Sequence, residues 1–372
     1  MKKIKYFSYY GCLDKGNLRK NSPAADTKIE YIISVFNRIS YSVDVISLAP
    51  SGEQYFLKSS LQYKNINQFR YFASFGFTNS FLKYINWIFM RMQFIFWCVF
   101  NLKKHEQIIV YHSLGYARIF IWLQKVKKLR IIGEVEEIYQ DVIELTERRA
   151  RDELRFIELC TKYIFPTQLL DKKINVLAKP SVVVHGIYSR ANITEEKFLD
   201  GKIHVVYGGT LDPQKGAYEA VESATCLSGE YHVHICGFGD ATRIKEYIEQ
   251  IKLKTQATIT FEGELIGSAY TNFIQKCHIG LCTQNPDALF TATSFPSKVL
   301  VYLANGLKVV SIRIPAIVES AVGDSICFYD VPTAKSIASA ILLASKSSST
   351  GREILSYLDV EFKKELETLL DQ

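Results

Sequence analysis

The chain has 372 residues, 48% of them hydrophobic, and a formal net charge of +7. This length is too great for one ordinary domain and this composition excludes an intrinsically disordered chain, so two domains of roughly 170 to 190 residues, each with its own core, are expected. The eight cysteines stand singly, with no C-x-x-C pair and no Cys/His group at metal-ligand spacing, so we expect neither a disulfide framework nor a zinc site, and a reducing cytoplasm as the location.

In the first half of the chain, short β-branched or aromatic runs alternate with helical stretches. The strand-like runs are residues 4–11, 42–50, 107–113, 130–137, 162–167 and 182–187, and the helical stretches are 23–38, 116–127 and 147–159. This alternation is typical of βαβ units around a parallel sheet. The opening MKKIKYFSYYGCL has the lysines of a signal peptide, but Lys5 and several tyrosines interrupt the apolar region, so a first strand is predicted instead.

An aromatic stretch over residues 71–100 interrupts this alternation. Its most apolar part, Phe81 to Phe100, has about the length of a bilayer span, yet Lys83 and Arg91 lie inside it, so we do not expect a transmembrane helix. Aromatic residues with scattered Lys and Arg fit a helix at a membrane interface or a groove for a lipid-linked acceptor. They fit a core helix of the first domain equally well, and the sequence leaves both interpretations open.

The βα pattern restarts after the polar stretch 189–202. Strand-like runs follow at residues 204–210, 231–239, 258–263, 278–283, 308–312 and 325–330, with a helix from Ser297. We therefore predict an α/β protein of two tandem, doubly wound Rossmann-like domains, residues 1–186 and 187–351. A final helical pattern over 352–370 has no strand after it, so we expect it to pack on the first domain.

Charge is distributed unevenly between the two halves. Residues 1–185 contain 28 Lys and Arg against 16 Asp and Glu, a net +12, whereas the remainder has a net −5. A basic first half favours contact with an anionic membrane surface, which would place the protein peripherally on the cytoplasmic face of the inner membrane. The alternative is a merely solvated basic face. Nucleic acid is not expected as a partner, because no helix-turn-helix, zinc-finger or RNP pattern accompanies the charge.

The most informative motif is HVVYGGTLDPQK, residues 204–215. A strand that ends in Gly208 and Gly209 lets the backbone approach an anion, and Lys215 adds a cation at the head of the next helix. Recognition of a diphosphate is the natural use, although helix starts often carry such residues for geometry alone.

Further turns follow later strands of the same domain. CGFGD (236–240) supplies Gly237 and Phe238 at the carboxyl edge of the sheet, where open α/β sheets bind ligands. In TATSFPSKVLVYLANGLKVVS (291–311), Pro296 and Ser297 start a helix whose free amides and Lys298 face the same crevice as Lys215. Anion-binding turns after several strands of one domain predict a nucleotide-diphosphate site.

These motifs resemble those of the family 4-like (glycosyl transferases group 1) glycosyltransferases of GT-B fold. YGGTLDPQKG resembles the V-G-R-L-x-x-x-K-G element, CGFGD the G-x-G turn, SFPSKVLVYLANGLKVV the S-x-P-x-K-x-x-E-Y-x-A-x-G-x-P-V-V element, and His185-Gly186-Ile187-Tyr188 the interdomain N-G-[IV]-[DY] element. The resemblance implies two domains that face an interdomain cleft, sugar transfer with retention of configuration, a UDP-sugar or GDP-sugar as substrate, UDP-sugar being favoured, and no cofactor.

The resemblance also implies the residues of the donor site. They are Gly208, Gly209, Thr210, Lys215, Gly237, Phe238, Glu264, Leu265, Ser294, Phe295, Pro296, Ser297 and Lys298. Thr210 stands where the family usually has an arginine beside the diphosphate, and Thr293 and Val301 stand where it usually has two glutamates. These departures put the orientation and identity of the donor sugar in doubt.

In the first domain the resemblance points to three places. The loop YYGCLDKG, with Tyr10, Gly11 and Gly16, corresponds to one that lies over the reacting centre. RIIGEVEEIYQD resembles I-I-x-E-V-[RH]-D-L-W and places Glu136 and Glu137 at the family's cleft pair, with His112 at a nearby strand end. His112, Glu136, Glu137 and Lys215 are the predicted catalytic residues. A strand-end histidine is more often structural, and at least one acid near Glu136 is expected to be salt-bridged or merely exposed.

The sequence has no D-x-D motif, so we expect lysines and helix termini rather than a metal ion to neutralise the leaving diphosphate. The predicted function is glycosyl transfer from a nucleotide-diphosphate sugar to a saccharide or polyprenyl-diphosphate-linked acceptor in bacterial surface polysaccharide assembly, with the first domain binding the acceptor. Two alternatives stay open: a GT-B nucleotide-sugar epimerase, and a non-catalytic nucleotide-sugar-binding subunit, which the substitutions at Thr293 and Val301 favour.

Overall fold

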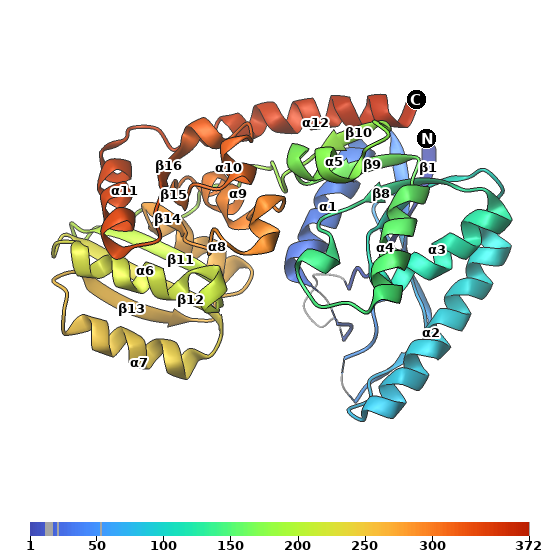
Figure 1. Cartoon of the computed structure of the whole chain (residues 1–372), viewed down its shortest axis with the longest axis horizontal. Coiled ribbons are helices and arrows are strands. Elements are labelled where there is room, and N and C mark those ends of the chain that lie inside the picture. The colour runs from blue at the N-terminus through green and yellow to red at the C-terminus, as the bar shows by residue number, and fades with distance from the viewer. Residues whose placement is uncertain (12–17, 21, 53, 372) are drawn as a thin grey trace. The chain divides into compact units, whose positions relative to one another are not determined.

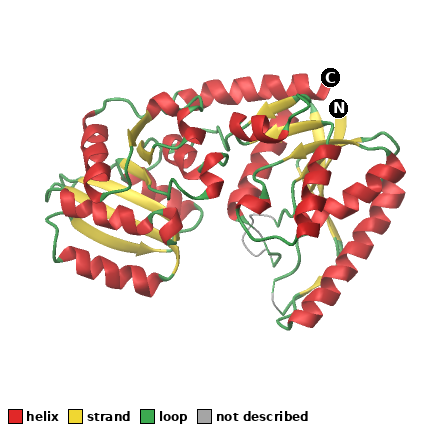
Figure 2. Ribbon diagram, in the orientation of Figure 1, coloured by secondary structure: helices red, strands yellow, loops and turns green. Residues whose placement is uncertain are grey.

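The structure is a computed structural model that describes residues 1–11, 18–20, 22–52 and 54–371 (Figure 1). The chain divides into two compact units, Met1–Val184 with Glu361–Gln372 and His185–Val360, here called the first and the second unit. In each unit helices pack against a central sheet of mainly or wholly parallel strands (Figure 2). The predicted α/β class is confirmed.

Within the described residues, the first unit has an eight-stranded sheet in the order β10-β9-β8-β7-β1-β2-β5-β4. The strands are β1 (Lys2–Ser8), β2 (Tyr41–Ser47), β4 (Ser60–Lys64), β5 (Asn67–Tyr71), β7 (Gln107–Tyr111), β8 (Arg130–Glu134), β9 (Lys162–Phe165) and β10 (Ser181–Val183). All pairs are parallel except β4 with β5. The central strands read as continuous apolar runs because both faces of a parallel sheet are covered.

The helices of the first unit are α1 (Pro23–Arg38), α2 (Ser80–Asn101), α3 (Leu114–Lys127), α4 (Glu147–Leu159) and α5 (Gln168–Ile174), and β3 (Phe56–Leu57) pairs with β6 (Ser74–Phe75). The bounds of α1 and α4 agree with those predicted from the sequence. The strands between residues 56 and 75 were not predicted. β4 alternates polar and apolar residues, but it is only five residues long and exposed along most of its length, so its sequence carries a weak signal for a strand.

The second unit has a six-stranded, all-parallel sheet among the described residues, in the order β13-β12-β11-β14-β15-β16. Its strands are β11 (Ile203–Leu211), β12 (Tyr231–Gly239), β13 (Thr258–Gly263), β14 (Ile279–Cys282), β15 (Lys308–Ile312) and β16 (Ile326–Tyr329), and its helices are α6 (Ala217–Ser223), α7 (Ala241–Lys252), α8 (Ser268–Lys276), α9 (Ser297–Ala304), α10 (Pro315–Val318) and α11 (Ala334–Lys346).

The strand order of the second unit reverses between β11 and β14. The chain first adds β12 and β13 on one side of β11 and then crosses to add β14, β15 and β16 on the other. Such a reversal opens a crevice at the carboxyl ends of the two central strands, which is where open α/β sheets bind ligands. The fold therefore directs attention to the residues that follow β11 and β14.

The last helix, α12 (Ile354–Asp371), contributes its residues from 361 onward to the first unit. Phe362 stacks on Tyr31 of α1 with ring centroids 6.1 Å apart, and Lys162 Nζ donates to the carbonyl oxygen of Leu369 at 2.6 Å. None of the helices in the described part of the chain combines the length and apolar character that crossing a bilayer requires.

Candidate functional site

The backbone is closely packed at the carboxyl ends of β11 and β12. The N–H of Gly208 donates to Tyr302 Oη at 2.8 Å. Gly237 has φ of +153°, and a Cβ at this position would lie 1.7 Å from the carbonyl oxygen of Gly209. Gly209 itself faces the end of the Lys298 side chain, with 3.2 Å from an added Cβ to Nζ. Glycine is thus required where these strand ends meet, beside a cation.

Lys298, in the first turn of α9, presents that cation. Its Nζ is buried and has no hydrogen-bond partner among the described residues, and it lies 4.0 Å from the centroid of the Tyr207 ring. Burial, with a smaller contribution from the nearby Lys215, lowers the pKa of Lys298 to about 8. A buried ammonium without an anionic partner is costly, so this position favours binding of an anion.

Ser294 adds a second unsatisfied group just before the same helix. Its Oγ is buried and lacks a hydrogen-bond partner within the described part of the chain. The turn is held by Phe295, which stacks on His185 with ring centroids 4.8 Å apart, and Pro296 precedes the first helical residue, Ser297. A hydroxyl, a lysine and a helix start therefore stand together, as anion recognition requires.

Hydrogen bonds fix the backbone around Lys215. It ends a short 3-10 turn, and Tyr207 Oη donates to the carbonyl oxygens of Thr210 at 2.8 Å and Lys215 at 3.0 Å. Gly216 follows with φ of +83°, and Thr283, directly after β14, donates its Oγ1 to the Gly216 carbonyl oxygen at 2.5 Å. The crevice between β11 and β14 thus brings Lys215 close enough to Lys298 to lower the pKa of Lys298.

The other residues predicted for donor binding lie at or beyond the same sheet edge. Thr210 is half-buried near the end of β11, and the Phe238 side chain is 55% exposed on β12. Glu264 is exposed and Leu265 half-buried in the loop after β13, the edge strand. Of the other two departures from the family pattern, Thr293 is buried and Val301 half-buried. Tyr207 contacts Lys298 and was missed by sequence reasoning, because Lys298 follows much later in the chain and no local motif indicates the contact.

His112, predicted as catalytic, is enclosed within the first unit. Its side chain is 1% exposed, it stacks on Phe156, and its Nε2 lies 3.3 Å from Glu153 Oε1. Burial lowers the pKa of His112 to about 4, so the ring is neutral at physiological pH. The structure gives this histidine the surroundings of a core residue.

The acids that follow β8 have different environments. Glu136 forms an ion pair with Lys28 of α1, with 2.6 Å from Oε1 to Nζ, as expected for at least one acid of this group. Glu134 is fully buried, accepts a hydrogen bond from Tyr6, and has its pKa raised to about 8 by burial. Glu137 is half-buried, and its main chain hydrogen-bonds to His112.

The predicted cleft loop is described only at its start. Tyr10 Oη donates to Glu30 at 2.6 Å, and the Gly11 N–H donates to Asp26 Oδ2 at 3.1 Å. Burial raises the pKa of Asp26 to about 6. Gly16 lies outside the described residues. The polar groups at the base of this loop are thus satisfied within the first unit.

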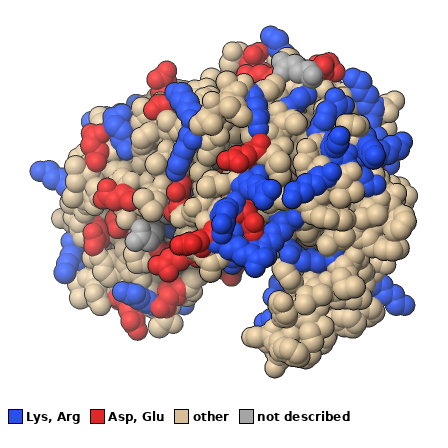
Figure 3. Space-filling view, turned by 45° about the vertical axis from the view of Figure 1, so that its right-hand side comes forward, with Lys and Arg blue, Asp and Glu red and all other residues tan. Residues whose placement is uncertain are grey.

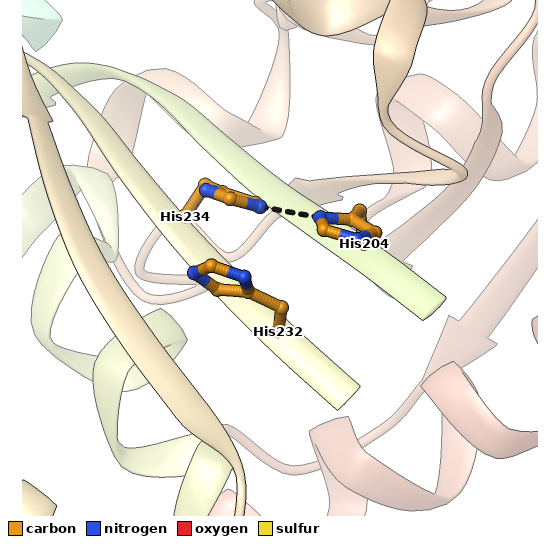
Figure 4. A group of neighbouring side chains, drawn as sticks. All are labelled: His204, His232 and His234. Atoms are coloured by element: carbon orange, nitrogen blue, oxygen red, sulfur yellow. Dashed lines mark hydrogen bonds between the residues drawn. The ribbon is translucent and has the colours of Figure 1, made fainter. Parts of the chain in front are cut away.

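Three histidines come together at the amino ends of β11 and β12 (Figure 4). His204 lies opposite His232 in the strand register, His234 follows two residues later, and their ring nitrogens lie within 4.8 Å of one another. The sequence led us to expect no zinc site, and that expectation stays untested, although these three histidines lie close enough to share a metal ion. The H-x-H of β12 was the available signal, but His204 joins it only through strand pairing.

The nitrogens of this cluster are already hydrogen-bonded. His204 Nε2 lies 2.8 Å from Asp200, His234 Nδ1 lies 2.8 Å from Glu262, and the facing nitrogens of the two rings are also 2.8 Å apart. If both outer nitrogens donate to carboxylates, one more proton must lie between the rings. These hydrogen bonds lower the pKa of Asp200 to about 2 and lower that of Glu262. The cluster lies at the opposite ends of the strands from Lys298.

Comparison with solved structures identifies proteins of similar fold. No family model and no curated protein sequence matches the chain. Among solved structures, the E. coli trehalose-6-phosphate protein bound with UDP-2-fluoro glucose has a TM-score of 0.68 at 10% identity over 100% of this chain and 98% of that chain. HepE of Anabaena in complex with UDP and glucose has a TM-score of 0.65 at 12% identity over 100% of both chains.

A UDP-forming α,α-trehalose-phosphate synthase from Burkholderia xenovorans, in complex with glucose-6-phosphate, is also similar, with a TM-score of 0.65 at 10% identity over 100% of this chain and 98% of that chain. Sequence identity this low establishes the fold rather than the activity. The likeness extends over both units and agrees with the parallel sheets described above. The chain has the GT-B fold of these glycosyltransferases.

Proposed function

We propose that the protein is a glycosyltransferase that binds a UDP-sugar in the second unit and transfers the sugar, with retention of configuration, to an acceptor bound by the first. The observation that carries the proposal is the buried, unpartnered Nζ of Lys298 beside Lys215, at the point where the strand order reverses. Ser294 Oγ and the start of α9 add donors for the same diphosphate.

The structural neighbours support this choice of donor. HepE was solved with UDP and glucose, the E. coli protein with UDP-2-fluoro glucose, and the Burkholderia enzyme is UDP-forming. We extend this donor class to the present chain because its own residues supply cations and amides at the expected sheet edge. UDP-sugar is favoured, and GDP-sugar is the alternative donor.

The proposed roles of the two lysines follow from the negative charge that develops on the leaving phosphate during sugar transfer. As the bond from the sugar to the diphosphate breaks, negative charge grows on the leaving phosphate, so Lys215 and Lys298 stabilise the transition state more than the ground state. The leaving diphosphate can itself accept the proton of the acceptor hydroxyl, which leaves the protein to align the two substrates. His112, Glu136 and Glu137 are proposed to position hydroxyl groups, although His112 and Glu136 are engaged with partners of their own in the structure described above.

For the acceptor, we propose a saccharide or a polyprenyl-diphosphate-linked saccharide, in bacterial surface polysaccharide assembly at the cytoplasmic face of the inner membrane. The support is the net +12 of residues 1–185 and the aromatic helix α2. If screened charge holds the protein at the membrane, high salt releases it. Fractionation at low and high ionic strength tests this, and wholly soluble protein at low salt would contradict it.

Transfer is tested by incubating the pure protein with radiolabelled UDP-sugars and GDP-sugars, with and without a lipid-linked saccharide extract. The proposal predicts transfer of label to the acceptor and slow release of free sugar without it. An isomerised nucleotide sugar would indicate an epimerase. Binding without turnover would indicate a non-catalytic subunit, the reading that Thr293 and Val301 favour.

The donor site is tested by a double-mutant cycle. Lys215→Ala and Lys298→Ala are each expected to lower turnover by roughly 10² to 10³, the effect of losing one preorganised electrostatic contact. The double variant should lose less than the product of the two effects if both lysines contact one diphosphate. An unaffected Lys215→Ala enzyme would remove this lysine from the site.

A further inference from the structure

Helix α2 is apolar on its exposed side as well as on its buried side, unlike an ordinary helix on a water-facing surface. Its fully buried residues form a narrow stripe at every fourth position, Asn86, Met90, Phe94 and Cys98. The opposite side is apolar and exposed, with Phe81 69%, Phe96 68% and Phe100 71% exposed. A surface helix of a water-soluble protein normally turns its apolar stripe inward.

The polar residues of α2 are used to hold the helix against the protein. Asn86 Oδ1 accepts the N–H of Phe75 at 2.8 Å, and Gln93 Nε2 donates to the carbonyl oxygen of Ala73 at 2.9 Å. Arg91 donates to the carbonyl oxygen of Gly115 and lies 3.8 Å over the Trp87 ring. These three polar side chains therefore help to hold α2 against the protein, together with the buried Met90 and Phe94, while a second set of large apolar residues faces out.

Charge around this helix has one sign. Residues 54–105 contain seven Lys and Arg and no Asp or Glu. Figure 3 shows a broad surface without charged side chains in the part of the first unit where α2 lies, bordered by Lys and Arg. A second copy packed on this face through a two-fold axis would oppose like charges. An anionic bilayer satisfies both features, because exposed apolar residues enter the acyl region while cations meet the headgroups.

A cavity of about 220 Å³ opens beside the inward edge of α2. Its apolar wall includes Phe77, Trp87 and Met90, and Lys20, Lys83 and Arg91 also line it. Two of its polar atoms, Ser51 Oγ and Arg91 Nε, are buried and have no hydrogen-bond partner among the described residues. An apolar cavity with cations and unsatisfied donors matches a ligand that joins a phosphate to a hydrocarbon chain.

From this juxtaposition we infer that the first unit binds the phosphate end of a membrane-embedded isoprenoid lipid in the α2 cavity, with the outward face of α2 inserted in the anionic bilayer. The inference rests on the proposed function, since it assigns a place to the lipid part of a polyprenyl-linked acceptor. The site consists of residues separate from the diphosphate-binding lysines of the second unit, so each can be tested without the other.

The test measures partitioning of the full chain into three kinds of vesicle: phosphatidylcholine alone, phosphatidylcholine with phosphatidylglycerol, and phosphatidylcholine with polyprenyl phosphate at equal surface charge. We expect a preference of about tenfold for polyprenyl phosphate over phosphatidylglycerol, the size of one charge-assisted hydrogen bond. Lys20→Gln/Lys83→Gln should remove this preference. The matched control Lys103→Gln/Lys104→Gln, with the same loss of charge outside the cavity, should retain it.

Equal binding to both anionic vesicles, or equal effects of the two double variants, would overturn the cavity assignment. For the outer face, Phe96→Ser/Phe100→Ser should lower binding to all three vesicles while the melting temperature stays unchanged, because both side chains are exposed. Unchanged binding would overturn insertion. UDP affinity, measured by calorimetry on the same variants, should stay constant, and a protein that prefers polyprenyl phosphate but does not bind UDP would leave the inference standing without the proposed function.

Discussion

The residues predicted for the site have different surroundings in the two units. In the second unit, Lys298 Nζ and Ser294 Oγ are buried without hydrogen-bond partners among the described residues, beside strand ends that require glycine. In the first unit, Glu136 forms an ion pair with Lys28, and His112 is enclosed beside Glu153 and Phe156, with an Nε2 that has no hydrogen bond among the described residues. A buried ammonium is costly unless an anion pairs with it, whereas a neutral imidazole is tolerated in a core. This difference in charge favours the second unit for the diphosphate proposed above, and the first unit offers mainly an apolar cavity.

The largest effect should come from Lys298→Met. Turnover is expected to fall by roughly 10² to 10³. Because burial lowers the pKa of Lys298 to about 8, its ammonium destabilises the folded state by about 3 kcal/mol at neutral pH, and methionine should raise the melting temperature. Initial rates and thermal melts measure both. Lys252→Met, on exposed α7, is the control that should change neither. A destabilised Lys298→Met protein would show that the lysine is structural.

A second test concerns His112 and the dependence of stability on pH. Its pKa of about 4 lies below the ordinary 6.5, so the unfolded chain binds more protons and the free energy of unfolding should fall as pH drops from 6.5 to 4. Between these two pH values, the lowered pKa of His112 should reduce the free energy of unfolding by about 3 kcal/mol in total. His112→Asn should remove this part of the slope in urea titrations, and His105→Asn, at an exposed position, should not. An unchanged slope in His112→Asn would mean that the ring is solvated and available to substrate.

A third test adds one methyl group at the strand ends. Gly237→Ala places a Cβ against the carbonyl oxygen of Gly209 at a φ that other residues rarely adopt, so we expect a loss of about 2 kcal/mol in stability and weaker UDP binding. Gly229→Ala is the matched control, since its added Cβ would meet only Gln256 O at 3.6 Å. Denaturation and calorimetry on both variants measure the effect. A neutral Gly237→Ala change would contradict the tight approach of β11 and β12.

The smallest expected effect is that of chelation. Lysines and helix amides neutralise the diphosphate in this account, so activity should survive EDTA. Initial rates before and after chelation, with magnesium or manganese added back, check this. Loss of activity that either ion restores would show that a metal handles the phosphate charge.

The fold could be predicted from the sequence wherever local signals agree with tertiary structure. Pro23 begins α1, and the apolar runs of β7 and β8 are buried on a parallel sheet, so their periodicity and composition carried the prediction. The signals between residues 56 and 75 are weaker because the strands there are only two to five residues long and β4, at the sheet edge, is mostly exposed. The sequence also left α2 undecided between core and interface, and the structure shows a helix with one narrow buried stripe.

Part of the candidate site could be predicted because its residues also stand in local sequence motifs. The glycine turns and lysines of the second unit stand in contiguous motifs, each with a local physical reason. The burial of Lys298 over Tyr207 depends on the contact of α9 with β11, and the meeting of His204 with His232 and His234 depends on the pairing of β11 with β12. Periodicity within one segment does not report such contacts between distant segments. The partners of His112 and Glu136 come from α4 and α1, which no local motif around either residue indicates.

The most direct test of the central claim is hydrogen exchange of the full chain with and without UDP. Binding in the second unit predicts slower exchange in three segments, 207–216, 236–239 and 293–299, which hold the strand ends, both lysines and the start of α9. Lys298→Met should reduce this protection, and residues 81–100 of the first unit should exchange unchanged. Protection by UDP confined to the first unit, or protection that Lys298→Met leaves intact, would contradict the assignment of the donor site.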